Sequence, residues 1–222
     1  FIIPLDVAFD GKIVIEDDNL QYDNTLFFNI NKRENIKVLS INQTDDGFLS
    51  KIYTNDEFDY VSAKFNELNY NSLEAQNLIV LNELEDIPNS LITALKSFTD
   101  NGGLIVIIPS NKSALDSYNQ LFANYLLPSF NPLNSTEKKI TSINFSHPLL
   151  INVFDKKVTN FQYPKVNSYF PNGASGGSSI LNFEDSSSFL SESNRAYAFS
   201  AALNEGNSNF KNSPLIVPVL YN

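Results

Sequence analysis

Hydrophobic and polar residues alternate in short runs through the first thirty residues of the chain, which is typical of β-strands. The stretches Phe1–Phe9, Lys12–Glu16 and Leu26–Ile30 are expected to be strands, and Asp10-Gly11 is expected to be a hairpin turn. Two or three strands cannot bury both faces of a sheet. We therefore expect residues 1–33 to be the end of a preceding β-sandwich, or an extension packed on the main domain.

From about residue 35 the pattern changes to alternating strands and helices. Short apolar runs predict three strands, at Ile36–Ile41, Phe58–Phe65 and Leu78–Leu81. Between the first two, Asp45–Tyr53 predicts a helix with Asp45 or Asp46 as its N-cap.

The clearest unit comes next in the chain. Pro88 is suited to a helix start, and Leu91, Leu95 and Phe98 recur at helical spacing. Gly102-Gly103 then ends the helix, since glycine readily takes the left-handed conformation found there, and the apolar run Leu104–Ile108 begins at once. Strand, helix and strand in this order predict a parallel crossover unit, and Ser113–Tyr125 predicts a further amphipathic helix.

The last third is less regular. Strands are expected at Lys139–Phe145, Asn160–Tyr169, Ser179–Phe183, Phe189–Leu190 and Arg195–Leu203, with a short helical turn at Pro148–Phe154. A closing helix is expected over Ser213–Tyr221, with Pro214 at its start and a kink at Pro218. The predicted fold class is α/β, a doubly wound and mostly parallel sheet with a β-rich C-terminal half.

Charge disfavours polyanionic partners. The 222 residues carry 25 acidic and 15 basic side chains and a net charge of −10, whereas nucleic acids and anionic membranes are bound by Lys and Arg. The basic pair Lys138-Lys139 is interpreted as a solvated strand end. The absence of Met, even at position 1, predicts a fragment, with any membrane contact made by segments outside it.

Several chemistries are excluded by composition. With no Cys and the single histidine His147, the chain cannot form a zinc-thiolate site, a multi-histidine metal site or a cysteine nucleophile. No phosphate-binding glycine motif occurs, and we expect no cofactor and no metal. The acidic segments Glu16–Asn24 and Asp45-Asp46-Gly47 lack the spacing of a calcium loop and are interpreted as turns.

One speculative crevice remains. Ser110 follows the apolar strand Leu104–Ile108, at the edge where parallel sheets place their ligands, and Asn111 and His147 could join it there. However, Pro109-Ser110-Asn111-Lys112 is not the Gly-x-Ser-x-Gly elbow that presents a nucleophilic serine. The preferred interpretation of His147 is a local hydrogen bond donated by its ring before Pro148, and no residue is assigned as catalytic.

Several segments in order resemble a known family. They are Ile13–Asp17 with Asp23–Phe28, Ile36–Ile41, Ala94–Pro109, His147–Leu149 with Val153-Phe154, and Asn212–Pro218. Together they resemble the carboxy-terminal region of BatA-type (aerotolerance-operon) membrane proteins of Bacteroidetes. The resemblance implies that residues 34–222 have a flavodoxin-like, class I glutamine-amidotransferase-like fold. Amidotransferase catalysis requires a Cys that this chain lacks, which implies a pseudoenzyme.

The resemblance also implies a periplasmic location, in an inner-membrane-anchored protein whose partners are Bat-type envelope proteins and a MoxR-type ATPase system. The function expected is therefore a non-catalytic, extracytoplasmic protein-interaction domain. The alternative is a domain that binds a small molecule or glycan, or hydrolyses it weakly, in the crevice near Ser110. Tyr163, Tyr169 and Phe170 are candidates for stacking on sugars.

Overall fold

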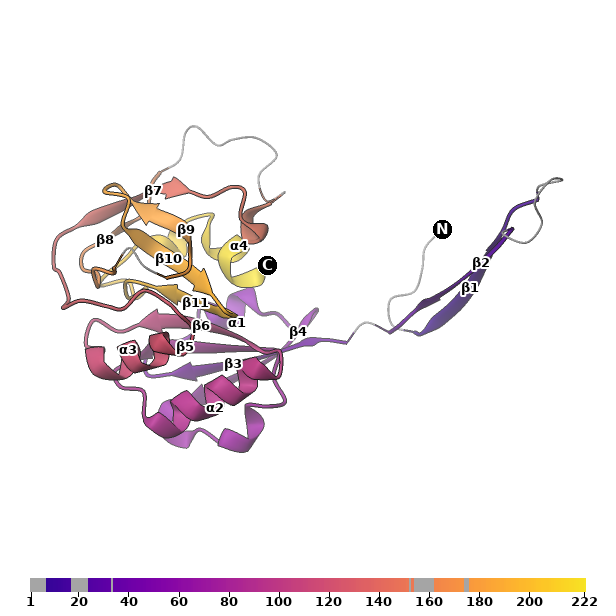
Figure 1. The fold of residues 1–222 in the computed structure, drawn as a ribbon, viewed down its shortest axis with the longest axis horizontal. Helices are drawn as coiled ribbons and strands as arrows, with labels where there is room; N and C mark the ends of the chain where they lie inside the picture. Colours follow the sequence, from indigo (N-terminus) through magenta and orange to yellow (C-terminus); the bar gives the residue numbers. More distant parts are fainter. Residues whose placement is uncertain (1–6, 17–23, 33, 152, 154–161, 174–175) are drawn as a thin grey trace. The chain divides into compact units, whose positions relative to one another are not determined.

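A computed structural model describes residues 7–16, 24–32, 34–151, 153, 162–173 and 176–222. The chain divides into two compact units, Phe1–Asn35 and Ile36–Asn222. This division lies two residues from the expected boundary at 33/34. The two units are drawn in Figure 1 and are described separately below.

The smaller unit contains an antiparallel ribbon of two strands, β1 (Phe9–Val14) and β2 (Thr25–Ile30). Opposed residues of an antiparallel pair share a face. The pairs Phe9–Ile30, Gly11–Phe28 and Ile13–Leu26 therefore make one face wholly apolar. On the other face the Asn29 side chain donates to Asp10 Oδ1 at 2.6 Å.

The predicted turn at Asp10-Gly11 is wrong, because both residues lie inside β1. Gly11 has a packing role there. A Cβ at Gly11 would lie 2.4 Å from the Phe28 ring, so the missing side chain leaves room for that ring. Residues 1–6 of the first expected strand, and most of the acidic loop 16–24, lie outside the described residues.

The larger unit is built on one mixed sheet. Its described strands follow the order β4-β3-β5-β6-β11-β10-β9-β7-β8. The parallel half comprises β3 (Ile36–Asn42), β4 (Phe58–Lys64), β5 (Leu78–Leu84), β6 (Leu104–Pro109) and β11 (Ala196–Phe199). The antiparallel half adds β7 (Lys138–Ile143), β8 (Lys165–Val166), β9 (Ser178–Phe183) and β10 (Ser188–Ser193). The α/β class is confirmed, but only half of the sheet is parallel.

Each face of the sheet carries its own apolar core. On one face the helices α2 (Asn89–Asp100) and α3 (Leu115–Ala123) pack against Ile79, Ile105 and Ile107. On the other face α1 (Leu49–Ile52) and α4 (Ile216–Tyr221) pack over Val80, Val106 and Ile108 (Figure 1). Strands buried on both faces explain why these sequences are continuously apolar. The doubly wound arrangement thus holds for the parallel half.

Several predicted elements differ from the structure. Asp46 does not cap α1, which begins at Leu49 without a side-chain cap. The strand expected at Asn160–Tyr169 is reduced to β8, and residues 160 and 161 lie outside the described part. The turn expected at Pro148–Phe154 is a 3-10 helix over Pro148–Leu150, with residues 152 and 154 not described.

The closing helix begins later than expected, at Ile216. Pro218 is then its third residue, and we infer no kink there, because the N–H groups of a first helical turn have no partner within the helix. Short 3-10 turns supply other connections, at Phe65–Glu67, Tyr70–Ser72 and Phe210–Asn212.

The predicted helix stop at Gly102-Gly103 is confirmed, and it yields a test of the packing. Gly102 has a φ of 105°, and a Cβ on Gly103 would lie 2.1 Å from the buried Phe98 ring. We expect Gly103→Ala to lower the free energy of unfolding by about 1–3 kcal/mol, the usual cost of overpacking. Urea unfolding measures this.

A compensating variant is the control. Phe98→Leu removes the ring and should make Gly103→Ala less costly in the double variant than in the single one. Additive losses in the double variant would contradict the proposed contact.

Candidate functional site

The order of the parallel strands creates a crevice at their carboxyl ends. β3 is followed in sequence by β4 on one side of it, and β5 is followed by β6 on the other side. The connections that leave the adjacent strands β3 and β5 therefore diverge. In open α/β sheets such a switch point, beyond the carboxyl ends of the strands, is the usual ligand position.

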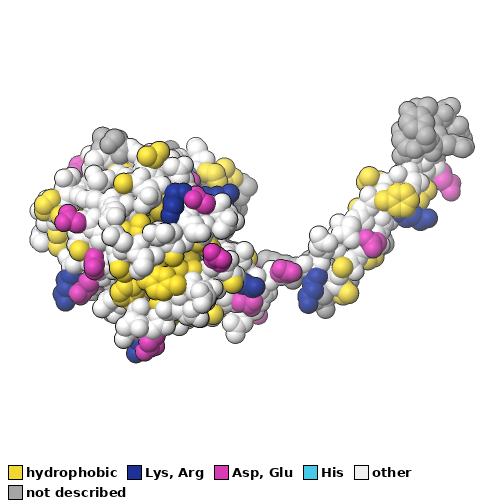
Figure 2. Space-filling view, turned by 60° about the horizontal axis from the view of Figure 1, so that its bottom comes forward, with side chains coloured by type: hydrophobic (Ala, Val, Ile, Leu, Met, Phe, Trp, Pro, Cys, Tyr) yellow, Lys and Arg dark blue, Asp and Glu magenta, His cyan; other side chains and the backbone are white. Residues whose placement is uncertain are grey.

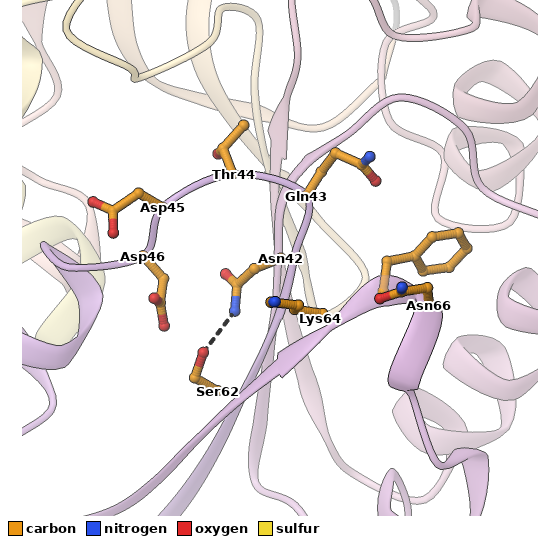
Figure 3. Close-up of a pocket in the computed structure, with 9 residues that line it drawn as sticks. Asn42, Gln43, Thr44, Asp45, Asp46, Ser62, Lys64 and Asn66 are labelled. Atoms are coloured by element: carbon orange, nitrogen blue, oxygen red, sulfur yellow. Dashed lines mark hydrogen bonds between the residues drawn. The ribbon is translucent and has the colours of Figure 1, made fainter.

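A cavity of about 570 Å³ lies beside this switch point. It is lined by residues that end β3 and β4 and begin the loops after them, including Asn42, Asp45, Asp46, Ser62 and Lys64. In Figure 3, Asn42, Asp46 and Ser62 point toward one another beneath the loop that carries Thr44 and Asp45. The volume is within the range of small-molecule sites.

Two buried amides join the strands at this edge. Asn82 Nδ2 donates to Asn42 Oδ1 at 3.0 Å and to the Asp45 carbonyl at 3.3 Å. Asn42 Nδ2 donates in turn to Ser40 Oγ at 2.8 Å and to Ser62 Oγ at 3.1 Å. These bonds connect β3, β4, β5 and the loop after β3, so the floor of the cavity is held by fixed partners.

A directed chain of hydrogen bonds ends at the Asp46 carboxylate. Tyr60 Oη donates to Asp46 Oδ2 at 2.5 Å, and the Ser40 hydroxyl lies 2.7 Å from Tyr60 Oη. Partial burial raises the pKa of Asp46, but hydrogen bonds from Tyr60, Ser62 and Ser40 outweigh it, so the pKa lies below its ordinary value. Burial, followed by the bond to Asp46, raises the pKa of Tyr60. Asp46 is therefore held as an anion.

Glu83 occupies a strained position at the end of β5. Its φ is 55°, and it lies where the register between β5 and β6 shifts, which is a β-bulge. Its buried carboxylate accepts from the Asn204 backbone N–H at 2.7 Å and from Asn204 Nδ2 at 2.9 Å. Both carboxylate oxygens are thus used to hold the loop that follows β11.

Ser110 lies where it was expected, directly after β6, but its hydroxyl is engaged locally. Ser110 Oγ accepts from the Lys112 backbone N–H at 3.2 Å, and the Ser110 N–H donates to Ser113 Oγ at 2.9 Å. Ser110 is not among the described residues with positive φ, so the backbone makes no strained elbow there. Asn111 Oδ1 is buried and finds no hydrogen-bond partner within the described residues.

His147 does not join Ser110. His147 Nε2 lies 2.9 Å from Glu192 Oε2, and Nδ1 accepts from the Leu149 backbone N–H at 3.3 Å. Because β10 pairs with β11 and β11 pairs with β6, Glu192 on β10 lies at the same height in the sheet as Val106 on β6. Ser110 is four residues further along, about 13 Å in the strand direction at the usual rise per residue. The ring therefore accepts its local hydrogen bond and donates to a carboxylate, contrary to the expected local donation.

Other candidates are placed by their burial. Tyr169 and Phe170 are buried in the core and are not available for stacking on a sugar, whereas Tyr163 is exposed. Lys138 is not a solvated strand end, because its ammonium pairs with Asp185 and lies 4.2 Å from the Tyr169 ring centroid. The expected turn before α1 is present but runs from Asp46 to Leu49, where the Leu49 N–H donates to the Asp46 carbonyl at 2.8 Å, so Asp45 precedes it.

The cavity lies at the edge of the sheet where the sequence placed a crevice, but beside β3 and β4 and not at the end of β6. Asn42 and Asn82 follow buried apolar runs, which is the same signal that singled out Ser110. Within the described ranges, no three Asp, Glu or His side chains cluster as metal ligands would. No helix in that part of the chain is long and apolar enough to cross a membrane.

No family model and no curated protein matches the sequence. Solved structures do resemble it. A ThuA-like protein from Bacteroides uniformis has a TM-score of 0.54 and 13% identity, with 77% of this chain and 82% of that chain covered. A protein from Thermoplasma acidophilum, described as a GMP synthase subunit, has a TM-score of 0.53 and 9% identity, with 84% and 93% covered.

An α-L-fucosidase, isoenzyme 2 from Paenibacillus thiaminolyticus, has a TM-score of 0.55 and 11% identity over 84% of this chain. The chain spans about a third of that enzyme, 32% of its length. At these identities the likeness is one of fold alone. The fold is glutamine-amidotransferase-like, as in the ThuA-like protein and the GMP synthase protein. The resemblance to BatA-type proteins stays a prediction.

The Asp46 chain of hydrogen bonds predicts a pH-dependent contribution to stability. Because the folded-state pKa lies below the ordinary value of 3.8, the contribution is complete above that value and is lost as the pH falls through the folded-state pKa. We expect Asp46→Asn to cost about 0.5–1.5 kcal/mol at pH 7, the range for one partly exposed hydrogen bond. The cost should shrink toward pH 3.

Urea unfolding at both pH values measures this difference. Asp45→Asn is the matched control, because the neighbouring carboxylate takes no part in the chain of hydrogen bonds from Ser40 and Tyr60. An Asp46→Asn cost that is the same at pH 7 and pH 3 would refute the charged role of Asp46.

Proposed function

We propose that residues 36–222 form a non-catalytic binding domain that acts through contacts with other proteins of the bacterial envelope. The observation that carries this proposal is the separation of Ser110 from His147. A serine hydrolase must join its nucleophile to a base by a hydrogen bond. Here each side chain is engaged elsewhere, Ser110 by the Lys112 N–H and His147 by Glu192.

Exposed apolar surface supports binding to protein. Apolar side chains gather at the centre of the face of the larger unit that Figure 2 presents. Continuous apolar surface is a common mark of protein interfaces.

Charge supports a protein partner over a polyanion. Lys and Arg side chains are scattered on the face shown in Figure 2, and the whole chain has a net charge of −10. The envelope location and the identity of the partners, Bat-type proteins, rest on the resemblance in the sequence.

The absence of catalysis can be tested on the purified chain. We expect no hydrolysis of p-nitrophenyl acetate or of glutamine above the buffer rate, because among the described residues the Ser110 hydroxyl bonds only to the Lys112 N–H and His147 is engaged by Glu192. Ser110→Ala should leave any background unchanged, as should Ser97→Ala on the exposed face of α2. A rate that Ser110→Ala abolishes and Ser97→Ala retains would overturn the proposal.

The interaction role can be tested in the native membrane. Cross-linking of the full-length protein, with and without residues 36–222, should show specific partners that disappear with the deletion. Ser110→Ala is the matched control and should retain the same partners, since binding does not use that hydroxyl. An unchanged set of partners after the deletion would remove the basis for an interaction domain.

A further inference from the structure

Two groups of residues line the cavity at the carboxyl ends of β3 and β4. One is a floor whose polar groups already have hydrogen-bond partners in the protein, and the other is an exposed rim. The floor consists of Asn42 and Asp46, whose polar groups bond to Ser40, Tyr60, Ser62 and Asn82. The rim consists of Gln43, Thr44, Asp45, Lys64 and Asn66, which are all exposed. No side-chain hydrogen bond or ion pair joins these five to other described residues. The rim alone is therefore available to a ligand.

The rim offers donors and acceptors together. Lys64 only donates, Asp45 only accepts, and the amides of Gln43 and Asn66 do both. A ligand that displaces water from these groups must both donate and accept hydrogen bonds, because a polar group left unpaired costs free energy. Hydroxyl groups donate and accept at the same atom, so a ligand rich in hydroxyls meets this demand.

Charge narrows the ligand class further. Asp45 and Asp46 outweigh Lys64, so the cavity has a formal charge of −1 and does not favour phosphates or sugar acids. The two carboxylates fall short of the acidic sets that hold metal ions. Phe65, which is partly buried, adds one apolar surface to the lining. Sugar rings present C–H groups between their hydroxyls and suit such a mixed wall.

We propose that this cavity binds a neutral saccharide, held by the rim residues Gln43, Asp45, Lys64 and Asn66 over the fixed floor. This inference goes beyond the proposed function, because the saccharide would be a small ligand of the larger unit in addition to its protein partners. The saccharide lies beside β3 and β4, two strands away from the Ser110 crevice considered from the sequence.

The test is a titration of the purified chain with neutral mono- and disaccharides, monitored by amide chemical shifts in NMR spectra. We expect the shifts to change for residues 42–46 and 62–66. Asp45→Asn and Lys64→Ala should each weaken binding about tenfold, the effect of one charge-assisted hydrogen bond. The matched controls are Asp56→Asn and Lys51→Ala, at exposed positions outside the cavity, which should bind as the wild type does.

Three outcomes would overturn the inference. They are no shifts at these residues with any neutral sugar at tens of millimolar, equal weakening by the control variants, and binding of glucuronate, phosphate, spermidine or a dipeptide in preference to neutral sugars. In each of these three cases the proposed function would still be supported if deletion of residues 36–222 removed specific protein partners. Conversely, cleavage of a bound disaccharide would contradict the proposed non-catalytic role but not the proposed saccharide site.

Discussion

Burial of the carboxyl ends of β3 and β5 on both faces is the constraint on which the crevice depends. Asn42 and Asn82 are 6% and 1% exposed, so water cannot satisfy their amides. Each amide must find partners on a neighbouring strand or loop, and the bond between them fixes where the two strands end. The Asp45 carbonyl and the Ser62 hydroxyl are further hydrogen-bond partners of these two amides. Loops that are otherwise exposed are thereby given a defined position above the cavity.

The same constraint explains the backbone strain at Glu83, one of the described residues other than glycine with a positive φ. A left-handed conformation at a residue other than glycine costs about 1–3 kcal/mol and persists only where surrounding contacts enforce it. At Glu83 those contacts are the two hydrogen bonds from Asn204, which a buried carboxylate needs. In a nucleophile elbow, strain after a strand presents the reacting side chain. Here the strain is on β5 and directs a carboxylate into the protein, while Ser110 at the end of β6 is unstrained.

The local sequence pattern predicted the parallel half of the sheet well. Strands buried on both faces must be apolar, and the glycines that end helix α2, Gly102-Gly103, are also a local signal. The errors arose where a distant residue decided the outcome. Asp10-Gly11 resembles a turn, but Phe28 on the opposite strand requires a residue without a Cβ. Asp46 resembles a helix cap, but Tyr60 on β4 takes its carboxylate. The separation of Ser110 from His147 follows only from the register of β10 and β11, which no local pattern contains.

The part of the chain that follows β6 supports the crevice from a distance, although none of its residues lines the cavity. β11 pairs in parallel with β6 and antiparallel with β10, so it joins the two halves of the sheet. The rings of Phe189, Phe199 and Phe210 pack together in the core that also contains Val106 and Ile108. The loop after β11 then carries Asn204 to Glu83, 121 residues away in sequence. A stable crevice therefore requires the whole larger unit, and a protein truncated after β6 would leave the Glu83 carboxylate buried without its donors.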